Sequence, residues 1–522
     1  MAQRAQCFPT ENHIVVLDLG SQYSLLIVKT LRKQGILAVL MPGSTPAPDA
    51  LSQHTRGIVI SGGPASTAGA PMLDLAWFDV DVPVLGICLG FQLMAAYYGG
   101  QVTHGGEGEY GTAQLHWVYS ARELTLNIPP RPIHVWMSHM DSVTRMPEEW
   151  DRLASTPACP LAACGTKDRY RLGVQFHPEV KHSQFGNQFL LNWATHVCSM
   201  DTSWTSGHML SEIITKITER VQQEEKVLVA VSGGVDSSVT ASMMVQALGA
   251  ERVHCVFVDN GLLREGEVED MMRLIGHVNP IVVDAKARFF AALAGISDPE
   301  AKRRAIGKTF IDVLQEEGKR LDGGNGGIGW LAQGTLYSDV VESMSASGEV
   351  IKTHHNVGGL PDTLGLSLIE PLRLLFKDEV RALGVEMGLP AAMLDRQPFP
   401  GPGLAIRVLG PVCPERVAIV RAADAIVRAD APGSDNTGRP LWQTFAVLLP
   451  VKAVGVMGDR RTYDNVCVLR AVCSEDAMTA SLPKLGMGTW SGIADRIVRE
   501  VPGINRVCFD LTSKPPGTIE WE

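Results

Sequence analysis

The feature that most constrains the fold is a series of short, almost continuous runs of aliphatic and β-branched residues, each followed by a helical stretch. Strands that are apolar on both faces are typical of parallel sheets that helices cover on each side. Two such groups of runs occur, so we predict two α/β domains, each built on a doubly wound parallel sheet. The runs occupy residues 13–20, 57–64, 82–88, 171–177, 226–231 and 253–258.

Two interruptions divide this pattern. Residues 199–210 are polar and rich in turn formers, and residues 397–404 contain three prolines, which fix φ and remove hydrogen-bond donors. Strand-like runs resume at 445–449 and 465–469, and a length of 522 residues suits about three domains. We therefore expect two α/β domains at 13–202 and 203–403 and a smaller α+β domain at 404–522.

Composition excludes several classes of protein. The net charge is −10 and no long basic run occurs, which disfavours a nucleic-acid partner. No apolar run reaches the roughly 18 residues that span a membrane, and the first residues lack the core of a signal peptide, so we expect a cytoplasmic protein.

The ten cysteines form no Cys-x-x-Cys pair, which disfavours a zinc site. His354 and His355 are adjacent, so on a strand they would point to opposite faces. The glycine-rich segment 322–329 suggests a loop.

Cys88 needs its own explanation. It stands between Gly86 and Gly90, where a predicted strand ends and a helix begins. A nucleophile at such an elbow is exposed at the sheet edge, and the helix N-terminus favours a thiolate. The backbone N–H of Leu89 would then face a developing oxyanion. The alternative is a buried structural cysteine at a strand end.

A base and its orienting group follow a later strand. His177 is the last residue of the run at 171–177, and Glu179 lies two residues further on. Together with Cys88 they supply a nucleophile, a base and a carboxylate that orients the base. The alternative for a single histidine in this position is a structural role.

These residues resemble the class I glutamine amidotransferase family over about 13–200. The resemblance includes the segment 61–64, in which Gly63 would donate a second N–H to the oxyanion, and Gln92, which would bind glutamine. It also includes the loop at 137–141, although Met140 stands where the family often has glycine. The implied chemistry is attack of Cys88 on the glutamine amide, release of ammonia and hydrolysis of a glutamyl thioester.

The segment 232–238, the phosphate loop, follows a buried strand and precedes an apolar helix. Its small residues let backbone N–H groups close around an anion, and Asp236 can hold Mg²⁺ against phosphates. No lysine is present, so it differs from the common P-loop motif. The alternative is a helix cap rich in serine and aspartate. The loop consists of Ser232, Gly233, Gly234, Val235, Asp236, Ser237 and Ser238.

The phosphate loop resembles that of N-type ATP pyrophosphatases, which split ATP into AMP and pyrophosphate and adenylate a substrate oxygen. Residues 257–264 resemble the following strand and its nucleotide-facing loop. The two resemblances together imply that ammonia from glutamine aminates an adenylated acceptor. The resemblance implies that Mg²⁺ is used together with ATP. It implies no tightly bound organic cofactor.

Further segments resemble the GMP synthetase family along the whole chain. That resemblance implies that the acceptor is xanthosine 5′-monophosphate (XMP), which is aminated at C2 to GMP. It implies that Arg303 and Lys514 contact the substrate phosphate with Glu520 nearby, and that the last domain forms a homodimer. A solvated tail lysine is the alternative for Lys514. The segments are 298–307, 330–337, 352–359, 376–381, 396–403, 455–459 and 513–522.

Two rival hypotheses stay open at this point. One is another glutamine-dependent adenylating ligase such as an NAD⁺ synthetase, although these usually carry a nitrilase-type glutaminase in place of the Cys88 elbow. The other is a binding or regulatory protein on a degenerate scaffold. The joint presence of Cys88, His177, Glu179 and the intact phosphate loop argues against it, because a protein without catalysis needs none of them.

Overall fold

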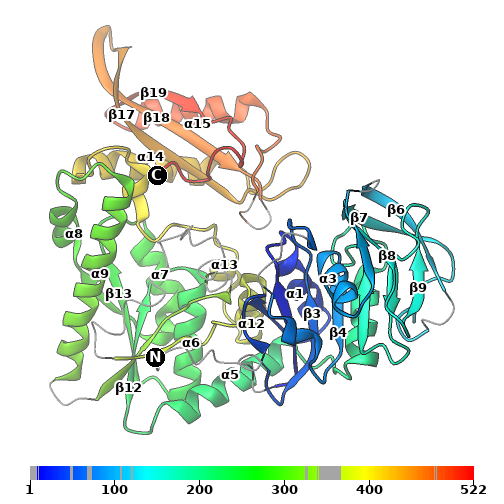
Figure 1. Cartoon of the computed structure of the whole chain (residues 1–522). Helices are drawn as coiled ribbons and strands as arrows, with labels where there is room; N and C mark the ends of the chain where they lie inside the picture. The colour runs from blue at the N-terminus through cyan, green and yellow to red at the C-terminus, as the bar shows by residue number, and fades with distance from the viewer. Residues whose placement is uncertain are drawn as a thin grey trace. The chain divides into compact units, whose positions relative to one another are not determined.

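The computed structural model describes most of the chain, and its contacts divide it into two compact units with the boundary between Met209 and Leu210 (Figure 1). His354 and His355 lie outside the described residues, as do 324–326 of the glycine-rich segment. None of the helices in the described ranges combines the length and the hydrophobicity that crossing a membrane requires. The described residues are 9, 11–47, 51–67, 73–105, 108–118, 122–323, 327–337, 339, 366–474, 477 and 479–522.

The first unit is built on a nine-stranded sheet of order β2-β1-β3-β4-β11-β10-β9-β6-β7. Its elements are β1 (His13–Asp18), α1 (Ser24–Lys33), β2 (Ala38–Pro42), β3 (Thr55–Ile60), η2 (Leu75–Phe78), β4 (Val84–Ile87), α3 (Leu89–Tyr97), β5 (Gln101–Thr103), β6 (Glu109–Trp117), β7 (Ile133–His139), β8 (Ser142–Arg145), β9 (Asp151–Ser155), β10 (Ala163–Gly165), β11 (Arg171–Val174), α4 (Gly186–Asn192) and η3 (Trp193–Val197). Helix α5 (Ser206–Arg220) contains the boundary between the units.

The predicted parallel sheet is confirmed for the five strands from β2 to β11. The four remaining strands are antiparallel, which was not predicted. Strand β6 shows why, because its residues alternate between exposed and partly buried positions and form no continuous apolar run. A half-exposed strand of this kind is typical of antiparallel pairing.

Neighbouring strands place the predicted nucleophile and base together. β4 and β11 are adjacent and parallel, with Gly86 opposite Gly173 and Ile87 opposite Val174. The carboxyl ends of parallel neighbours share one edge of the sheet, so the residues after β4 and β11 must lie side by side there. Cys88 follows one strand and His177 the other.

The second unit contains a five-stranded parallel sheet of order β14-β13-β12-β15-β16, which confirms the second predicted sheet. The chain passes from β12 outward to β14 and returns to β15 on the other side of β12, which creates a topological switch point. The elements are β12 (Lys226–Val231), α6 (Val235–Leu248), β13 (Val253–Asp259), α7 (Glu267–Ile275), η4 (Gly276–Val278), β14 (Ile281–Asp284), α8 (Lys286–Leu293), α9 (Pro299–Asp322), β15 (Ile328–Ala332), β16 (Ser367–Ile369), α12 (Lys377–Glu386), α13 (Ala391–Leu394) and η5 (Gly403–Arg407).

The predicted loop at 322–329 is wrong at both ends. Asp322 is the last residue of α9, and Ile328 and Gly329 belong to β15. The apolar run that begins at Ile328 pairs with β12 in the centre of the sheet, and this burial outweighs the turn preference of the glycine beside it.

The C-terminal part of the second unit is a three-stranded sheet of order β17-β18-β19. The long hairpin of β17 and β18 extends past β19 (Figure 1). One cluster of buried side chains includes Leu228 and Val258 of the parallel sheet together with Val420 and Leu469, so the two sheets share a core. The elements are α14 (Pro414–Asp430), β17 (Gln443–Met457), β18 (Arg460–Val472), α15 (Met487–Glu500) and β19 (Ile504–Phe509).

Candidate active site

Cys88 occupies a strained turn between β4 and α3. Its backbone has φ 52° and ψ −106°, a region that side-chain-bearing residues seldom adopt. The turn is tight because α3 begins against the end of β3, where the Gly90 N–H donates to the Ser61 carbonyl at 3.1 Å. A Cβ on Gly90 would lie 2.3 Å from the Ile60 carbonyl oxygen, so a larger residue would push the helix away. The sequence thus folds locally into a nucleophile elbow.

His177 and Glu179 form a buried pair beside this turn. The imidazole Nδ1 is 2.7 Å from the Glu179 Oε1, and both side chains are at most 5% exposed. The imidazole also hydrogen-bonds to Cys88. Burial disfavours its charged form, but the hydrogen bonds to Cys88 and Glu179 outweigh burial and raise the pKa of His177 to about 10. The structure therefore brings the three predicted residues together as a thiol, an imidazole and a carboxylate.

Two groups that sequence reasoning missed also contact the thiol. The Gln175 amide donates to the Cys88 Sγ at 3.7 Å, and the Cys88 thiol donates to the Ser138 carbonyl at 3.7 Å. Gln175 lies just beyond β11, two residues before His177, so its place in the strand run was the available signal. The predicted loop at 137–141 is wrong at 137–139, because these residues pair with β6 and form the end of β7. Ser138 contacts the thiol through its main chain, which sequence cannot reveal.

Gln92 lies close to the thiol, and its predicted contact with glutamine stays a prediction. Its side chain is buried, and its amide donates to the Asp141 carbonyl at 2.7 Å and to the Gln175 Oε1 at 3.3 Å. Gln92 therefore holds Asp141, just after β7, and so restrains the end of the strand that carries Ser138. Met140, next to Asp141, points its side chain outward and is half exposed.

The segment at 61–64 lines the space beside the thiol with Gly62. A Cβ on Gly62 would lie 3.1 Å from the His177 Cε1 and 3.6 Å from the Cys88 Cβ. A Cβ on Gly63 would instead meet the Leu19 carbonyl at 2.6 Å and the Leu89 side chain at 2.9 Å. Glycine at each position therefore allows neighbouring atoms to pack closely against the main chain. Gly62 is the one that faces the reacting groups, which the sequence motif did not distinguish.

The protonation of His177 should depend on Glu179. In a Glu179→Gln variant we expect the pKa of His177 to fall from about 10 toward its ordinary value of 6.5, because a carboxylate partner is lost. Glutamine hydrolysis should drop by on the order of 10²-fold or more, as expected for a base that has lost its orienting group. NMR titration of the labelled imidazole and steady-state glutaminase assays would measure both effects.

The same substitution should change stability in a defined pH window. A folded-state pKa raised above 6.5 contributes stability that is fully present below pH 6.5 and is lost as pH rises through about 10. The difference in unfolding free energy between wild type and Glu179→Gln should therefore narrow as pH rises through that window. A difference that widens would contradict the assignment of the proton to His177.

The phosphate loop connects β12 to the N-terminus of α6. Gly233 has φ +85°, the left-handed region in which glycine is favoured. The Ser232 N–H donates to the Ser237 Oγ at 3.2 Å, and the Gly234 N–H lies 3.4 Å from the Ser232 Oγ. Ser238 is fully buried and its hydroxyl donates to the Gly234 carbonyl, so Ser232 and Ser237 supply the loop's accessible hydroxyls.

A pocket of about 210 Å³ opens beside this loop. It lies between the ends of β12 and β15, at the switch point of the sheet, where α/β folds bind ligands. Asp236 faces it, and the Lys377 ammonium lies 3.9 Å from the Asp236 carboxylate. Val235 and Ser238 do not line it. The lining residues are Ala230, Ser232, Gly234, Asp236, Ser237, Gln333, Gly334, Thr335 and Asp339.

The three residues predicted to meet an acceptor phosphate are not joined to one another. Lys514 donates to the Ala477 carbonyl at 2.8 Å, and Arg303 donates to the main-chain oxygen of Glu522 at 2.6 Å. Glu520 forms a two-point ion pair with Arg407, at 2.9 and 3.2 Å. Within the described ranges no hydrogen bond or ion pair links Lys514, Arg303 and Glu520 directly.

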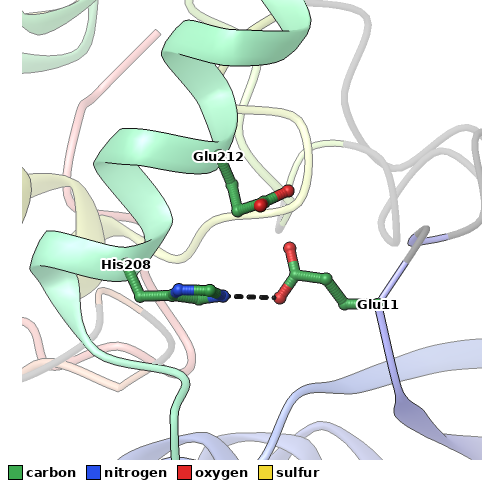
Figure 2. Close-up of side chains that lie close together, drawn as sticks. All are labelled: Glu11, His208 and Glu212. Atoms are coloured by element: carbon green, nitrogen blue, oxygen red, sulfur yellow. Dashed lines mark hydrogen bonds and ion pairs between the residues drawn. The ribbon is translucent and has the colours of Figure 1, made fainter.

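A further cavity of about 330 Å³ lies elsewhere in the first unit. Glu11 and His208 face it, and their side chains meet at 3.1 Å (Figure 2). No member of the predicted triad lines this cavity, so size alone does not identify the reactive site. The geometry around Cys88 does.

Comparison with known proteins places these features in a family. The model of class-I glutamine amidotransferases matches residues 15–197, that of NAD synthase residues 209–301, and that of the GMP synthase C terminal domain residues 433–521. The NAD synthase match covers only part of the second unit, so it does not support NAD⁺ synthetase for the whole chain.

Full-length relatives agree with that arrangement. A GMP synthase (glutamine-hydrolyzing) from a Nitratiruptor species is 49% identical, with 98% of this chain and 99% of the relative covered. Proteins of the same name from Listeria innocua and Syntrophomonas wolfei are 46% and 47% identical and are covered over 99% of their length, with 99% and 98% of this chain aligned. The chain therefore belongs to the glutamine-hydrolysing GMP synthase family.

Proposed function

We propose that this protein makes GMP from XMP, ATP and glutamine, with AMP, pyrophosphate and glutamate as the other products. The observation that carries the proposal is the full-length match to glutamine-hydrolysing GMP synthases. Two features of the structure support it, the thiol–imidazole–carboxylate set around Cys88 and the phosphate loop at the switch point of the second sheet.

The first half-reaction uses the residues around Cys88. Because the pKa of His177 is raised to about 10, its ring already holds the thiol proton at neutral pH, and the Cys88 thiolate attacks the amide carbon of glutamine. N–H groups of Leu89 and of the 62–63 segment stabilise the oxyanion, and the imidazolium returns its proton to the departing ammonia. Water activated by His177 then hydrolyses the thioester, while Glu179 holds the ring in position throughout.

The second half-reaction uses the phosphate loop. Backbone N–H groups and the hydroxyls of Ser232 and Ser237 would hold the pyrophosphate part of ATP at the N-terminus of α6. The C2 oxygen of XMP attacks the α-phosphate, pyrophosphate leaves, and ammonia then displaces AMP at C2. Asp236 and Asp339 give the pocket two carboxylates, which are the hard oxygen ligands that suit Mg²⁺. When bound, Mg²⁺ would neutralise phosphate charge.

Arg303 and Lys514 would bind the phosphate of XMP. Each already donates to a main-chain oxygen, at Glu522 and Ala477, and both cationic groups form strong charge-assisted hydrogen bonds with a dianionic phosphate. The Glu520 carboxylate, which Arg407 holds in place, would lie near the bound XMP.

We further propose three functional domains at 13–202, 203–403 and 404–522, in a cytoplasmic enzyme. The nine described cysteines are all free thiols, as expected in a reducing compartment.

One assay tests the proposed synthesis of GMP. Purified protein with glutamine, Mg-ATP and XMP should yield GMP, AMP and pyrophosphate in equal amounts. Formation of ADP, or turnover only with a different acceptor, would refute the proposal.

We also propose a homodimer formed through the β17–β18 hairpin. Val454 and Val456 point to one face of the strand, as alternate residues do, and Tyr463 pairs with Val454 on that face. All three side chains are more than half exposed. The opposite face packs inward, since a Cβ on Gly455 would lie 2.7 Å from Asn505. An exposed apolar sheet face of this kind is typical of a protein interface.

A charge on that face should weaken the dimer. We expect Val456→Asp to raise the dimer dissociation constant by about tenfold or more, because a carboxylate would lose its hydration on association. Analytical ultracentrifugation over a dilution series would measure it. Val385→Asp, at another exposed valine, should leave the mass unchanged. A monomeric wild type, or an unaffected Val456→Asp dimer, would refute this interface.

A further inference from the structure

The proline-rich segment that begins at Arg396 has no role in the chemistry described so far. Yet Arg396 reaches back to the phosphate loop, where one guanidinium nitrogen donates to the Gly233 carbonyl at 2.8 Å. Its other terminal nitrogen binds the Glu267 carboxylate. The segment therefore contacts the phosphate loop at Gly233, a residue that does not line the pocket, next to Gly234, which does.

The Gly233 carbonyl controls the direction of a loop N–H. In a trans peptide the C=O of one residue and the N–H of the next point in opposite directions. Holding the Gly233 carbonyl toward Arg396 therefore turns the Gly234 N–H toward Ser232 and the pocket. Gly233 and Gly234 both lack a Cβ, so this peptide can rotate with little steric resistance unless something holds it. Arg396 supplies that restraint.

Glu267 fixes Arg396 in turn. Its carboxylate is almost fully buried between Arg264, at 2.8 Å, and Arg396. Because the carboxylate is desolvated, movement of either arginine would leave a buried charge poorly compensated. The guanidinium of Arg396 thus has one strongly preferred position. Because it binds the Gly233 carbonyl, the peptide between Gly233 and Gly234 is held in one orientation as well.

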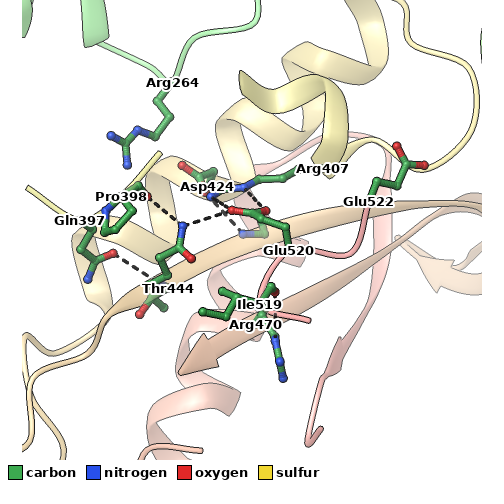
Figure 3. Close-up of polar contacts among 12 residues, drawn as sticks. Arg264, Gln397, Pro398, Arg407, Asp424, Thr444, Arg470, Ile519, Glu520 and Glu522 are labelled. Carbon is green, nitrogen blue, oxygen red and sulfur yellow. Dashed lines mark hydrogen bonds and ion pairs between the residues drawn. The ribbon is translucent and has the colours of Figure 1, made fainter. Parts of the chain in front are cut away.

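The same segment is also connected, through Gln443, to Glu520 in the tail, the C-terminal residues 513–522. The Gln397 Oε1 accepts from the Thr444 N–H at 3.2 Å, and the Gln443 amide donates to the Pro398 carbonyl at 2.9 Å and to the Glu520 Oε1 at 3.2 Å (Figure 3). Only one residue separates Arg396 from Pro398. A short rigid link therefore joins the phosphate loop to the tail residue Glu520.

A second connection runs in parallel with the first. The Phe399 ring lies under the guanidinium of Arg264, at 4.4 Å from the ring centroid, and near that of Arg407, at 5.3 Å. Arg264 holds Glu267, and Arg407 holds Glu520. Residues 396–399 are therefore connected both to the phosphate loop and to Glu520, through side chains as well as through the main chain.

We propose that residues 396–399 couple the two substrates of adenylation, with Arg396 as a positioning residue. When XMP engages the tail around Glu520, the segment is held, Arg396 restrains the Gly233 carbonyl, and the Gly234 N–H faces the nucleotide. ATP bound to the loop stabilises the same arrangement, so each ligand favours the other. This inference rests on the proposed function, because it takes XMP and ATP as the ligands.

Binding measurements test the coupling directly. Calorimetry would give the dissociation constant of an ATP analogue with a methylene group between the α- and β-phosphates, with and without saturating XMP. For wild type we expect XMP to tighten analogue binding by about fivefold or more, and the analogue to tighten XMP binding by the same factor. In Arg396→Met we expect that factor to fall to about one, while XMP alone binds within about twofold of wild type.

Two further variants separate positioning from general damage. Arg320→Met removes an exposed arginine that pairs with Glu317 on α9 and should keep the full coupling. Arg396→Lys keeps the charge, but one ammonium cannot hold the Gly233 carbonyl and Glu267 in the bidentate manner of a guanidinium, so its coupling should also fall. A purely structural role would instead lower the melting temperature and weaken both ligands without changing the coupling factor.

The outcomes distinguish this inference from the proposed function. Unchanged coupling in Arg396→Met and Arg396→Lys, or independent binding in wild type, overturns the inference if the same wild-type preparation makes GMP. A preparation that binds neither ligand and makes no GMP overturns the proposed function, and the inference with it.

Discussion

Replacing Cys88 with alanine is expected to abolish GMP formation from glutamine, by about 10³-fold or more, and to leave GMP formation from ammonium salts within about twofold. In the proposed mechanism the Cys88 thiol attacks the glutamine amide, and the His177–Glu179 pair, at 2.7 Å, serves as its base and orienting group. Amination of the adenylated acceptor uses the second unit and needs only ammonia. Steady-state assays with each nitrogen source would give the two rates.

Alanine is the informative replacement, because it keeps a Cβ at φ 52° and so leaves the backbone conformation unrelieved. Cys164→Ala provides a matched control in the same sheet. Burial raises the pKa of the Cys164 thiol to about 12, so it is not a nucleophile at neutral pH. We expect this control to retain glutamine-dependent synthesis. Loss of both activities in Cys88→Ala would contradict the separation of the two half-reactions.

Removing the Arg407 guanidinium should have the largest effect on stability. Arg407 is almost fully buried and neutralises both Asp424, at 3.3 Å, and Glu520, at 2.9 Å, while it stacks on the Phe445 ring at 4.0 Å. In Arg407→Met the two carboxylates lose this shared partner in a desolvated site. We expect the free energy of unfolding of the second unit to fall by about 3–5 kcal/mol.

Urea unfolding followed by tryptophan fluorescence would measure that loss. Arg496→Met is the comparison, because Arg496 forms exposed ion pairs with Asp430 and Glu500 and should shift the midpoint little. Adding Asp424→Asn to Arg407→Met should recover part of the stability, because it removes one of the two carboxylates that Arg407 neutralised, and the other ion pair it gives up is that of Asp424 with Arg428. A change in Arg407→Met no greater than that in Arg496→Met would refute the structural role assigned to the buried guanidinium.

The parts of the fold that could be predicted are those that single segments determine. The parallel strands follow from continuous apolar runs, and the elbow at Cys88 and the loop at 232–238 each need only one strand, one turn and one helix. The antiparallel strands could not be predicted in this way, because β6, β7 and β9 are partly exposed and carry no continuous apolar run, and β10 is buried but only three residues long.

Residues that act through distant partners were missed for a related reason. Gln175 contacts a thiol 87 positions earlier in the chain, and Arg396 contacts a carbonyl 163 positions earlier. The contact of Arg303, Lys514 and Glu520 with XMP stays a prediction from family resemblance, whereas their protein partners Glu522, Ala477 and Arg407 were not predicted. Such pairings depend on how whole elements pack, and side-chain chemistry alone does not encode them.

The backbone at Cys88 has a consequence for how this family can diverge. A residue with a Cβ at that φ and ψ carries a conformational cost of about 1–3 kcal/mol, which glycine would largely avoid. Selection for ammonia release is thus the force that keeps a destabilising residue in place. In a chain supplied with ammonia from outside, a change of Cys88 to glycine would stabilise the fold at no cost to ammonia-dependent synthesis, so nothing would then oppose loss of the glutaminase.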